Sequence, residues 1–444
     1  MKVYFETLGC PKNFNDTQVA QGFLLKNDIG LSETPEDADV IIVNTCGFIN
    51  DAKRESIDKI FEMLEFKEEG KKVLISGCLS QRYAEELKTE IPEADAILGV
   101  NDYERLADIL RKLFEKEHEE PEVFASCEYK SELPFDERVL EEGDYSATLK
   151  IAEGCDNRCA YCVIPSIRGG YRSKRKEDVI SEAEFLASKG IKELILIAQD
   201  VTNYGTDIYG RFALPELLRE IVKVEGIQWI RLMYCYEDRI TDELIEVMAS
   251  EPKICHYIDI PIQHSSDRTL KEMHRRSTGA SIRNTISRLR HAIPDIAIRT
   301  TLIVGFPGET EDDFDDLCDF VDEMRFQRLG VFAYSQEEGT PAGDREDQIP
   351  EDIKQDRLDQ IMRMQLDISY EHNQELIGSF LQVMVEERDP DGSYIGRSRY
   401  DAPEIDNSVI FSSYNDLKPG DLMEVFIDDA FDYDLVGHEV EERK

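Results

Sequence analysis

The stretch EGCDNRCAYC, residues 153–162, sets three cysteines in a C-x₃-C-x₂-C pattern where the strand-like segment ATLKIAEG ends; they are Cys155, Cys159 and Cys162. Three thiolates are one ligand short of a fully ligated four-iron cluster, so one iron would stay open to a substrate. Zinc is the alternative, but it normally takes four ligands, and the next histidine along the chain is His256. The pattern therefore favours an iron–sulfur cluster with one open iron.

A second set of three cysteines is spread along the N-terminal part of the chain. Cys10, Cys46 and Cys78 end the apolar runs KVYFETLGC, DVIIVNTC and KKVLISGC, and helical patterns follow at residues 16–27, 51–66 and 80–88. Strands that alternate with helices predict a doubly wound parallel sheet, whose strands end along one edge. The three thiols should meet there as a second three-thiolate site, the alternative being three small buried core residues.

Glycines accompany the spread cysteines. Gly9, Gly47 and Gly77 each adjoin one of them. Glycine lets a backbone come close to another group, and we expect these three to make room for a bulky ligand. The remaining cysteines lack triad spacing: Cys235, Cys255 and Cys318 are expected to be core residues, and Cys127 to be incidental.

The middle of the chain repeats a strand–helix pattern. Six strand-like runs, ATLKIAEG, ELILIAQ, QWIRLMY, HYIDIPI, AIRTTLIVG and LGVFAYS, are separated by amphipathic stretches. Six such units predict a partial (β/α)₆ barrel whose functional face lies at the carboxyl ends of the strands. After one long charged helix, short alternating runs with Asp-Pro-Asp-Gly and Lys-Pro-Gly turns predict a small all-β barrel.

These patterns divide the chain into five parts. The expected boundaries are an N-terminal cluster domain at residues 1–112, a charged linker at 113–143, the partial barrel at 144–349, a connecting helix at 350–376 and the β barrel at 377–444. The fold class is therefore α/β and multidomain, with an all-β domain at its end.

Composition limits the function classes. The chain has 444 residues and a formal charge of −42, and the segment from residue 376 onward holds 17 acidic and 6 basic residues, a net of −11. Such a surface repels phosphate backbones and favours a basic partner, although a salt-adapted host is a simpler explanation. With no long apolar run and no signal-peptide pattern, we expect no membrane contact, a cytoplasmic location and reduced thiols. The acidic surface favours a monomer.

The tight cysteine run resembles that of the radical S-adenosylmethionine superfamily. TLIVGFPGET, residues 301–310, is similar to the superfamily's fifth-strand glycine motif, which lines the adenosine, although it is also an ordinary strand-to-helix turn. The resemblance implies a four-iron cluster that cleaves S-adenosylmethionine to a 5′-deoxyadenosyl radical. It points to five cofactor-binding candidates, namely Gly305, Pro307, Gly308, Tyr161 and Gln199.

A narrower resemblance covers nearly the whole chain. LGCPKN, NTCGFI and SGCLSQRY around the spread cysteines look like segments of the methylthiotransferase family, and the order of domains, ending in a TRAM-type barrel, is the same. The family implies a second four-iron cluster on Cys10, Cys46 and Cys78 that carries the sulfur to be inserted. It also implies that S-adenosylmethionine donates the methyl group and that an external electron donor takes part.

Other polar residues at expected strand ends could face a ligand. Gln199, Asp200, Gln263 and His264 follow such strands, and polar loop contacts explain them equally well. His264 could be a general base, although nothing in the sequence supports that role specifically. No catalytic residue is therefore expected beyond the cluster ligands.

Two branches of the family differ in substrate. LGCPKN, CVIPSIRG and GRSRYDAPEIDNSVIF resemble the branch that modifies the β-carbon of an aspartate in the small-subunit ribosomal protein S-twelve, free or in the assembled subunit. The acidic barrel agrees with a basic protein partner. The alternative branch modifies an adenosine in transfer RNA. Five basic residues could meet phosphate, but they could also pair with the protein's own acids or bind a cofactor carboxylate: Arg168, Arg172, Lys174, Arg175 and Lys176. A two-cluster electron carrier or redox sensor is an alternative of a different class.

Overall fold

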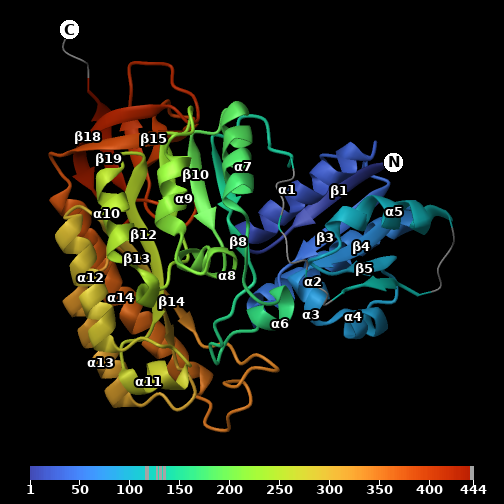
Figure 1. Ribbon diagram of the computed structural model, residues 1–444, viewed down its shortest axis with the longest axis horizontal. Helices are drawn as coiled ribbons and strands as arrows, with labels where there is room; N and C mark the ends of the chain where they lie inside the picture. Colours follow the sequence, from blue (N-terminus) through green and yellow to red (C-terminus); the bar gives the residue numbers. More distant parts are fainter. Residues whose placement is uncertain (116–119, 127–128, 130–132, 134–136, 441–444) are drawn as a thin grey trace. The chain divides into compact units, whose positions relative to one another are not determined.

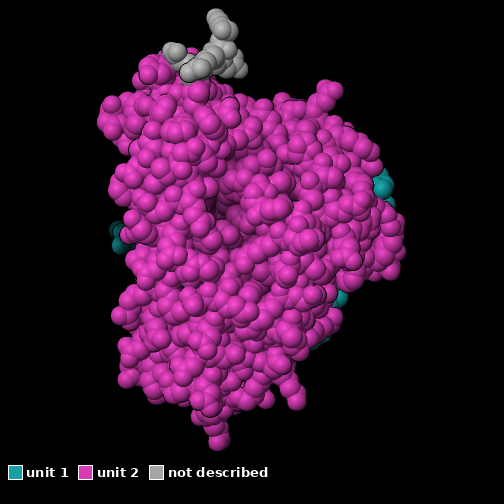
Figure 2. Space-filling view, turned by 90° about the vertical axis from the view of Figure 1, so that its left-hand side faces the viewer, with its two compact units in different colours: residues 1–141, 150–182, 335–343 teal, residues 142–149, 183–334, 344–444 magenta. Residues whose placement is uncertain are grey.

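The computed structural model describes residues 1–115, 120–126, 129, 133 and 137–440 (Figure 1). The chain forms two compact units, each made of segments that are not consecutive in the sequence. Figure 2 shows the two units in different colours. Unit 1 comprises residues 1–141, 150–182 and 335–343. Unit 2 comprises residues 142–149, 183–334 and 344–444.

Unit 1 is built on a parallel six-stranded sheet in the order β2-β1-β3-β4-β5-β6. Its strands are β1 (Lys2–Thr7), β2 (Gly30–Leu31), β3 (Val40–Thr45), β4 (Lys72–Gly77), β5 (Ala96–Leu98) and β6 (Glu122–Phe124). Its helices are α1 (Pro11–Lys26), α2 (Asn50–Leu64), α3 (Cys78–Arg82), α4 (Ala84–Glu90), α5 (Leu106–Glu115) and α6 (Ile164–Arg168), with 3₁₀ turns at Glu65–Glu69 and Tyr103–Arg105. The expected doubly wound parallel sheet is confirmed.

Both faces of this sheet are covered, which explains why β3 is buried along its whole length. Val40 and Ile42 face a core that α1 and α5 complete, whereas Ile41 and Val43 face a core that α2 and α4 complete. Successive side chains of a strand point to opposite faces, so a run such as VIIV fills two cores at once.

Several local boundaries differ from expectation. Helix α1 begins at Pro11 rather than Asp16, because proline is well suited to a first helical turn. The helix expected at 80–88 is two helices, α3 and α4, that meet at Tyr83. The short edge strand β6 pairs with β5 inside the segment expected to be a linker. Cys127 lies outside the described residues.

Unit 2 contains a second six-stranded sheet in the order β14-β13-β12-β11-β10-β7, which confirms the six expected strands. They are β7 (Ser146–Lys150), β10 (Glu193–Ile197), β11 (Trp229–Leu232), β12 (Ile254–Gln263), β13 (Ala297–Val304) and β14 (Arg328–Ala333), and β10 to β14 pair in parallel. The helices are α7 (Lys176–Ser188), which begins in unit 1, α8 (Thr206–Tyr209), α9 (Leu214–Ile221), α10 (Asp242–Ser250), α11 (Asp267–Glu272), α12 (Gly279–Ala292) and α13 (Glu311–Met324), with 3₁₀ turns at Val201–Asn203 and Glu237–Arg239.

The expected β barrel is present and closed, in the strand order β15-β16-β17-β19-β18. Its strands are β15 (Phe380–Arg388), β16 (Tyr394–Ser398), β17 (Val409–Ser412), β18 (Leu422–Ala430) and β19 (Leu435–Glu439). The helix α14 (Glu351–Glu375) leads into it, and the Asn373 side chain donates to the backbone oxygens of Phe431 and Asp432. Closure leaves no open sheet edge in this small domain.

The barrel is anchored at the amino-terminal ends of the central strands. Glu193, the first residue of β10, pairs with Arg397 of β16, and Arg328, the first residue of β14, pairs with Asp401. In Figure 1 the barrel strands β15 and β18 accordingly lie at one end of the central sheet, and α11 lies at the other. The barrel and the carboxyl ends of the strands are therefore at opposite ends of unit 2.

Candidate functional site

The tight cysteine triad lies in unit 1, in the loop between the short strand β8 (Ala152–Glu153) and α6. Strand β8 pairs antiparallel with β9 (Arg172–Ser173), and the Cys155 amide donates to the Gly169 oxygen at 3.0 Å. Cys155 and Cys159 are buried and Cys162 is half-buried. Burial raises the pKa of the Cys162 thiol, and the neighbouring Cys159 and Cys155 raise it further. The loop therefore brings the three thiols within electrostatic reach of one another.

The spread triad is also in unit 1. Cys10 caps α1 after β1, Cys46 follows β3, and Cys78 opens α3 directly after β4. Because β1, β3 and β4 are neighbours in the sheet, these positions lie side by side at its carboxyl edge. Burial raises the pKa of Cys46 to about 12, and the charges of Cys78 and Cys10 add to that effect. The expected convergence of three distant cysteines is what the structure shows.

The glycines beside these cysteines serve a different purpose from the one expected. A Cβ on Gly77 would lie 2.4 Å from the Thr45 oxygen, one on Gly47 would lie 2.7 Å from the Leu79 backbone, and one on Gly9 would lie 2.8 Å from the Cys46 Cβ. Gly9 and Gly77 also have positive φ angles, of 92° and 98°. These glycines let the strand-end loops pack against each other, a requirement of the chain itself that the expectation of a bulky ligand did not include.

Asn13 connects the three loops of the spread triad. Its Nδ2 donates to the backbone oxygen of Leu8 at 2.9 Å and to that of Thr45 at 3.0 Å. Leu8 and Thr45 lie just before Cys10 and Cys46 in the sequence. Its Oδ1 lies 3.6 Å from the Sγ of Cys78. Asn13 is the last residue of the LGCPKN segment and is buried. The role of Asn13 was not predicted from the sequence, because a motif does not reveal which backbone groups a side-chain amide will bind.

The two cysteine loops meet within unit 1. Val163 and Ile167, which follow the tight triad, pack against Cys78 and Val100. Arg168, the last residue of α6, places its Nη2 3.2 Å from the Cys78 Sγ. The loop that carries the tight triad therefore touches a residue of the spread triad directly.

A buried ion network continues from this contact. Arg168 pairs with Asp16 at 2.6 Å and with Glu153 at 3.4 Å, and Lys150 pairs with the same two carboxylates at 2.5 and 2.9 Å. Burial opposes the charge of Lys150, but Asp16 and Glu153 outweigh it and raise the pKa of the amine. A cavity of about 140 Å³ adjoins this network and is lined by Asn15, Tyr103, Arg172, Lys174 and Glu182, among others.

This network decides how much of the basic run is available to a phosphate. Arg168 pairs with Asp16 and Glu153, and Lys174 pairs with Glu182 at 2.6 Å. The Arg172 guanidinium lies over the Tyr129 ring. Of the explanations considered for the run, pairing with the protein's own acids accounts for its two buried members.

The segment after β14 also belongs to unit 1. Glu337, which is 2% exposed, accepts hydrogen bonds from Lys53 Nζ and Arg82 Nη1 at 2.8 and 2.7 Å. The Ala342 amide donates to the oxygen of Ala160, inside the tight cysteine loop. Sequence reasoning had no signal for this segment, because the two cations that pair with Glu337 lie 255 and 284 positions away in the chain.

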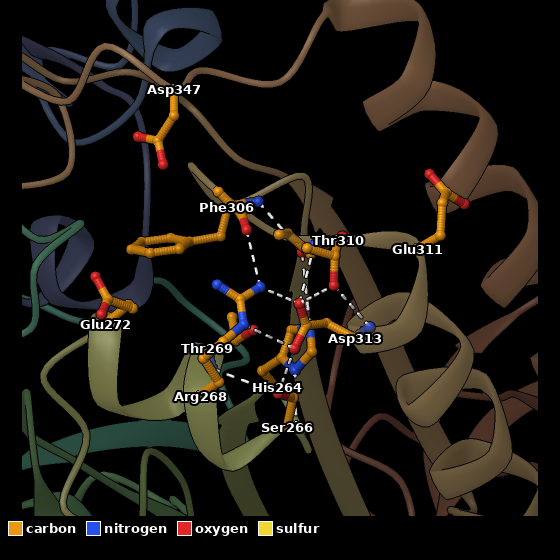
Figure 3. Close-up of polar contacts among 12 residues, drawn as sticks. His264, Ser266, Arg268, Thr269, Glu272, Phe306, Thr310, Glu311, Asp313 and Asp347 are labelled. Carbon is orange, nitrogen blue, oxygen red and sulfur yellow. Dashed lines mark hydrogen bonds and ion pairs between the residues drawn. The ribbon is translucent and has the colours of Figure 1, made fainter.

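The predicted glycine motif forms the turn between β13 and α13, in unit 2 (Figure 3). The amides of Gly305 and Phe306 donate to Oε2 of Glu309, and the Gly308 amide donates to the Asp347 oxygen. Proline has no N–H, so every amide from 305 to 308 already donates to an acceptor within the protein. A ligand at this turn would meet carbonyl oxygens and side chains rather than N–H groups.

Side chains from a neighbouring helix hold this turn in place. Arg268 of α11 donates to the Gly308 oxygen at 2.8 Å and pairs with Asp313, which also closes the capping box of α13 with Thr310 (Figure 3). Burial opposes the charge of Asp313, but the hydrogen bonds from Arg268, Ser266 and Thr310 lower the pKa of its carboxyl group. The turn is therefore rigidly supported.

His264 is committed to the same support. It is fully buried, and its Nδ1 accepts hydrogen bonds from the amides of Ser265 and Ser266, both at 3.0 Å (Figure 3). Its Nε2 lies 3.6 Å from Glu309. A ring nitrogen that accepts from two backbone amides is not free to take a proton from a substrate, so the geometry does not favour a general base.

The other candidates are divided between the two units. Tyr161 lies in unit 1, whereas Gln199, Gly305, Pro307 and Gly308 lie in unit 2. Asp200 is buried and paired with Arg239, and Gln263 ends β12 with a positive φ of 72°. Cys235 and Cys255 are core residues as expected, whereas Cys318 is only half-buried.

Neither triad has the arrangement of a single-ion site. Among the described residues, no group of three or more His, Cys, Asp or Glu side chains is close enough to hold one metal ion. A four-iron cluster places each thiolate on a different iron and so needs a wider set of ligands. A donor set of three cysteines, with no fourth ligand beside it among the described residues, suits such a cluster better than zinc. In the described part of the chain, no helix has the length and apolar character that crossing a membrane requires.

Three family descriptions match successive parts of the chain. They are the uncharacterized protein family UPF0004 at residues 2–99, the radical SAM superfamily at 149–321 and the TRAM domain at 377–440. Among solved structures, the radical S-adenosylmethionine methyltransferase TsrM from Kitasatospora setae has a TM-score of 0.56 at 16% identity, covering 77% of each chain. A likeness at this identity shows the fold.

Curated relatives match over the full length. A protein named ribosomal protein uS12 methylthiotransferase RimO from Lachnoclostridium phytofermentans is 48% identical over 440 residues, 98% of this chain and 99% of that protein. Proteins of the same name from Desulfitobacterium hafniense and Clostridioides difficile are 49% and 48% identical, over 99% and 98% of this chain and 99% and 98% of their own lengths.

Proposed function

Because the chain belongs to the RimO family of radical S-adenosylmethionine methylthiotransferases, we propose that it attaches a methylthio group to ribosomal protein uS12, at the β-carbon of an aspartate. The observation that carries the proposal is the contact, within unit 1, between the segment that follows the tight triad and the spread triad: Val163 and Ile167 pack against Cys78. A reaction that joins a carbon radical to a sulfur donor needs its two centres close together.

The cysteines take separate roles in this proposal. Cys155, Cys159 and Cys162 would hold the four-iron cluster that, with S-adenosylmethionine, supplies the radical. Cys10, Cys46 and Cys78 would hold a second four-iron cluster that presents the sulfur. Both sets fit such a cluster because each offers three buried or half-buried thiols.

The supporting residues orient and shield these thiols. Asn13 fixes the three strand-end loops, and Glu337 ties the segment 335–343 to α2 and α3. Tyr161 in unit 1, and Gln199 with the turn at Gly305, Pro307 and Gly308 in unit 2, remain the candidates for contact with the cofactor. Burial excludes water, which would otherwise quench a radical.

The acidic barrel suits a basic ribosomal protein. It lies at the amino-terminal ends of strands whose carboxyl ends carry the predicted cofactor turn, and an eight-residue strand such as β13 is about 26 Å long. A substrate that contacts both ends of unit 2 must span this length. An extended basic protein, free or in the assembled subunit, fits that requirement. We propose that the enzyme works in the cytoplasm as a monomer, with an external electron donor.

The test uses reconstituted protein, reductant, S-adenosylmethionine and either uS12 or transfer RNA. Cys159→Ala should abolish release of 5′-deoxyadenosine, whereas Cys46→Ala should retain release but stop sulfur insertion. Cys318→Ala, outside both triads, is the matched control and should keep both. Thiolation of transfer RNA but not of uS12 would refute the substrate, and thiolation by Cys46→Ala would refute the sulfur site.

A further inference from the structure

Arg168 belongs to neither triad, but it touches the spread triad and follows the loop that carries the tight triad. It lies six residues after Cys162, and its side chain is 3% exposed. Its Nη2 donates to the Cys78 Sγ at 3.2 Å and to the Asn13 Oδ1 at 2.9 Å, while Nη1 is held by Asp16 at 2.6 Å. The planar guanidinium is thus fixed on both edges, with one edge directed at a thiol.

The surroundings keep this cation in place. Asp16 and Glu153 pair with it, and Lys150 adds a second positive charge to the same two carboxylates. The four groups therefore balance, two positive and two negative, in a buried position. A buried charge is retained only where it is paired and hydrogen-bonded, and Arg168 meets both conditions.

We propose, on the basis of the function given above, that Arg168 is a positioning residue that donates an N–H···S hydrogen bond to the Cys78 thiolate of the second cluster and raises that cluster's reduction potential. A hydrogen bond and a positive charge beside a cysteine sulfur stabilise the reduced, more negative cluster. Because Arg168 is carried by the loop of the tight triad, the proper folding of that loop would set the potential of the other cluster.

A substitution of Asp16 tests the direction in which the midpoint potential of the second cluster shifts. Arg168→Met removes the positive charge and the hydrogen bond, so the midpoint potential should become more negative. Asp16→Asn keeps an oxygen acceptor for Arg168 but removes a negative charge, so the potential should become more positive. Arg168→Lys keeps the charge without the fork and should fall between the parent and Arg168→Met. A purely structural role would not move two neighbouring variants in opposite directions.

The measurement is a redox titration followed by electron paramagnetic resonance. The parent protein carries Cys155→Ala, Cys159→Ala and Cys162→Ala, so that only the second cluster contributes, and its iron content should be about four per chain. The control Arg172→Met removes a neighbouring cation that lies over Tyr129 and should give a smaller shift. In the otherwise wild-type enzyme, Arg168→Met should reduce thiolation of uS12 by about 10-fold to 100-fold.

The outcomes separate this inference from the proposed function. A parent that binds no cluster would refute the assignment of Cys10, Cys46 and Cys78, and the inference with it. A parent that binds its cluster, with equal potentials in Arg168→Lys, Arg168→Met and Asp16→Asn, would refute the inference alone. If Arg168→Met fails to retain iron, the midpoint potentials of Arg168→Lys and Asp16→Asn still test the inference, which predicts shifts in opposite directions.

Discussion

Glu193 is the buried carboxylate on which the attachment of the β barrel depends. It opens β10, is fully buried and accepts hydrogen bonds from Arg231 Nε at 2.9 Å, Arg397 Nη1 at 3.1 Å and Ser146 Oγ at 2.9 Å. Arg397 belongs to β16, so this one side chain joins the barrel to the central sheet. Glu193→Gln keeps the shape but removes the carboxylate that pairs with buried Arg231 and one of the two that pair with buried Arg397, the other being Glu386.

The size of the effect follows from the ionisation of Glu193. Burial opposes its charge, but Arg397 and Arg231 outweigh burial and lower the pKa from 4.5 to about 2. A difference of this size corresponds to about 3 kcal/mol of stability. Removing one partner of a buried ion pair typically costs about 3–5 kcal/mol, which agrees. We therefore expect Glu193→Gln to lower the melting temperature of unit 2 by about 6 °C or more.

Differential scanning calorimetry would measure the shift, with hydrogen exchange of β15 to β19 showing whether the barrel loosens first. Glu243→Gln is the control, because Glu243 is half exposed and pairs with Arg219 at the surface, where an ion pair contributes little. The wild type should also lose this stabilisation as the pH falls from about 4.5 towards 2, whereas Glu193→Gln should not. A melting temperature within 1 °C of wild type, about the shift of the control, would refute the reasoning.

Three further changes test the support of the two sites. Gly77→Ala should destabilise unit 1 by more than about 2 kcal/mol, because its Cβ would lie 2.4 Å from the Thr45 oxygen; Gly70→Ala, with positive φ but no atom within 4 Å, should cost about 1 kcal/mol in the same urea titration. Glu337→Gln should speed hydrogen exchange in residues 335–343 about tenfold, and an unchanged rate would show that its two cations do not hold the segment. His264→Gln should cost about 1–3 kcal/mol of stability, because two backbone amides lose their acceptor; lost turnover at full stability would instead point to a chemical role.

The sequence was sufficient to predict the gathering of distant cysteines. Apolar runs that end in Cys10, Cys46 and Cys78 imply parallel strands, and parallel strands end at one edge, so the juxtaposition follows from chain direction alone. The six central strands and the small β barrel were likewise predicted, from the alternation of apolar and polar segments and from turn residues. Strands of two or three residues, such as β2 and β6, carry too few side chains for any periodicity to show.

The contacts between loops could not be predicted in the same way. Gly9, Gly47 and Gly77 were correctly marked as positions of close approach, but the sequence does not say what approaches, and the structure shows that it is the chain itself. The partner of Arg168 is a thiol 90 positions earlier. A basic run in the sequence shows only that positive charges are present. Whether those side chains pair with phosphate or with a carboxylate of the protein depends on tertiary packing.

The membership of the tight cysteine loop in unit 1 has a consequence for assembly of the enzyme. Residues 150–182 come at the end of a strand of the central sheet in sequence, yet Lys150 and Arg168 pair with Asp16 of the N-terminal helix α1. Without α1, which carries Asp16, those two cations would be buried without that countercharge, at a cost of several kcal/mol. The loop proposed to hold the radical cluster therefore depends for its stability on the domain proposed to hold the sulfur, so the two sites should form together rather than independently.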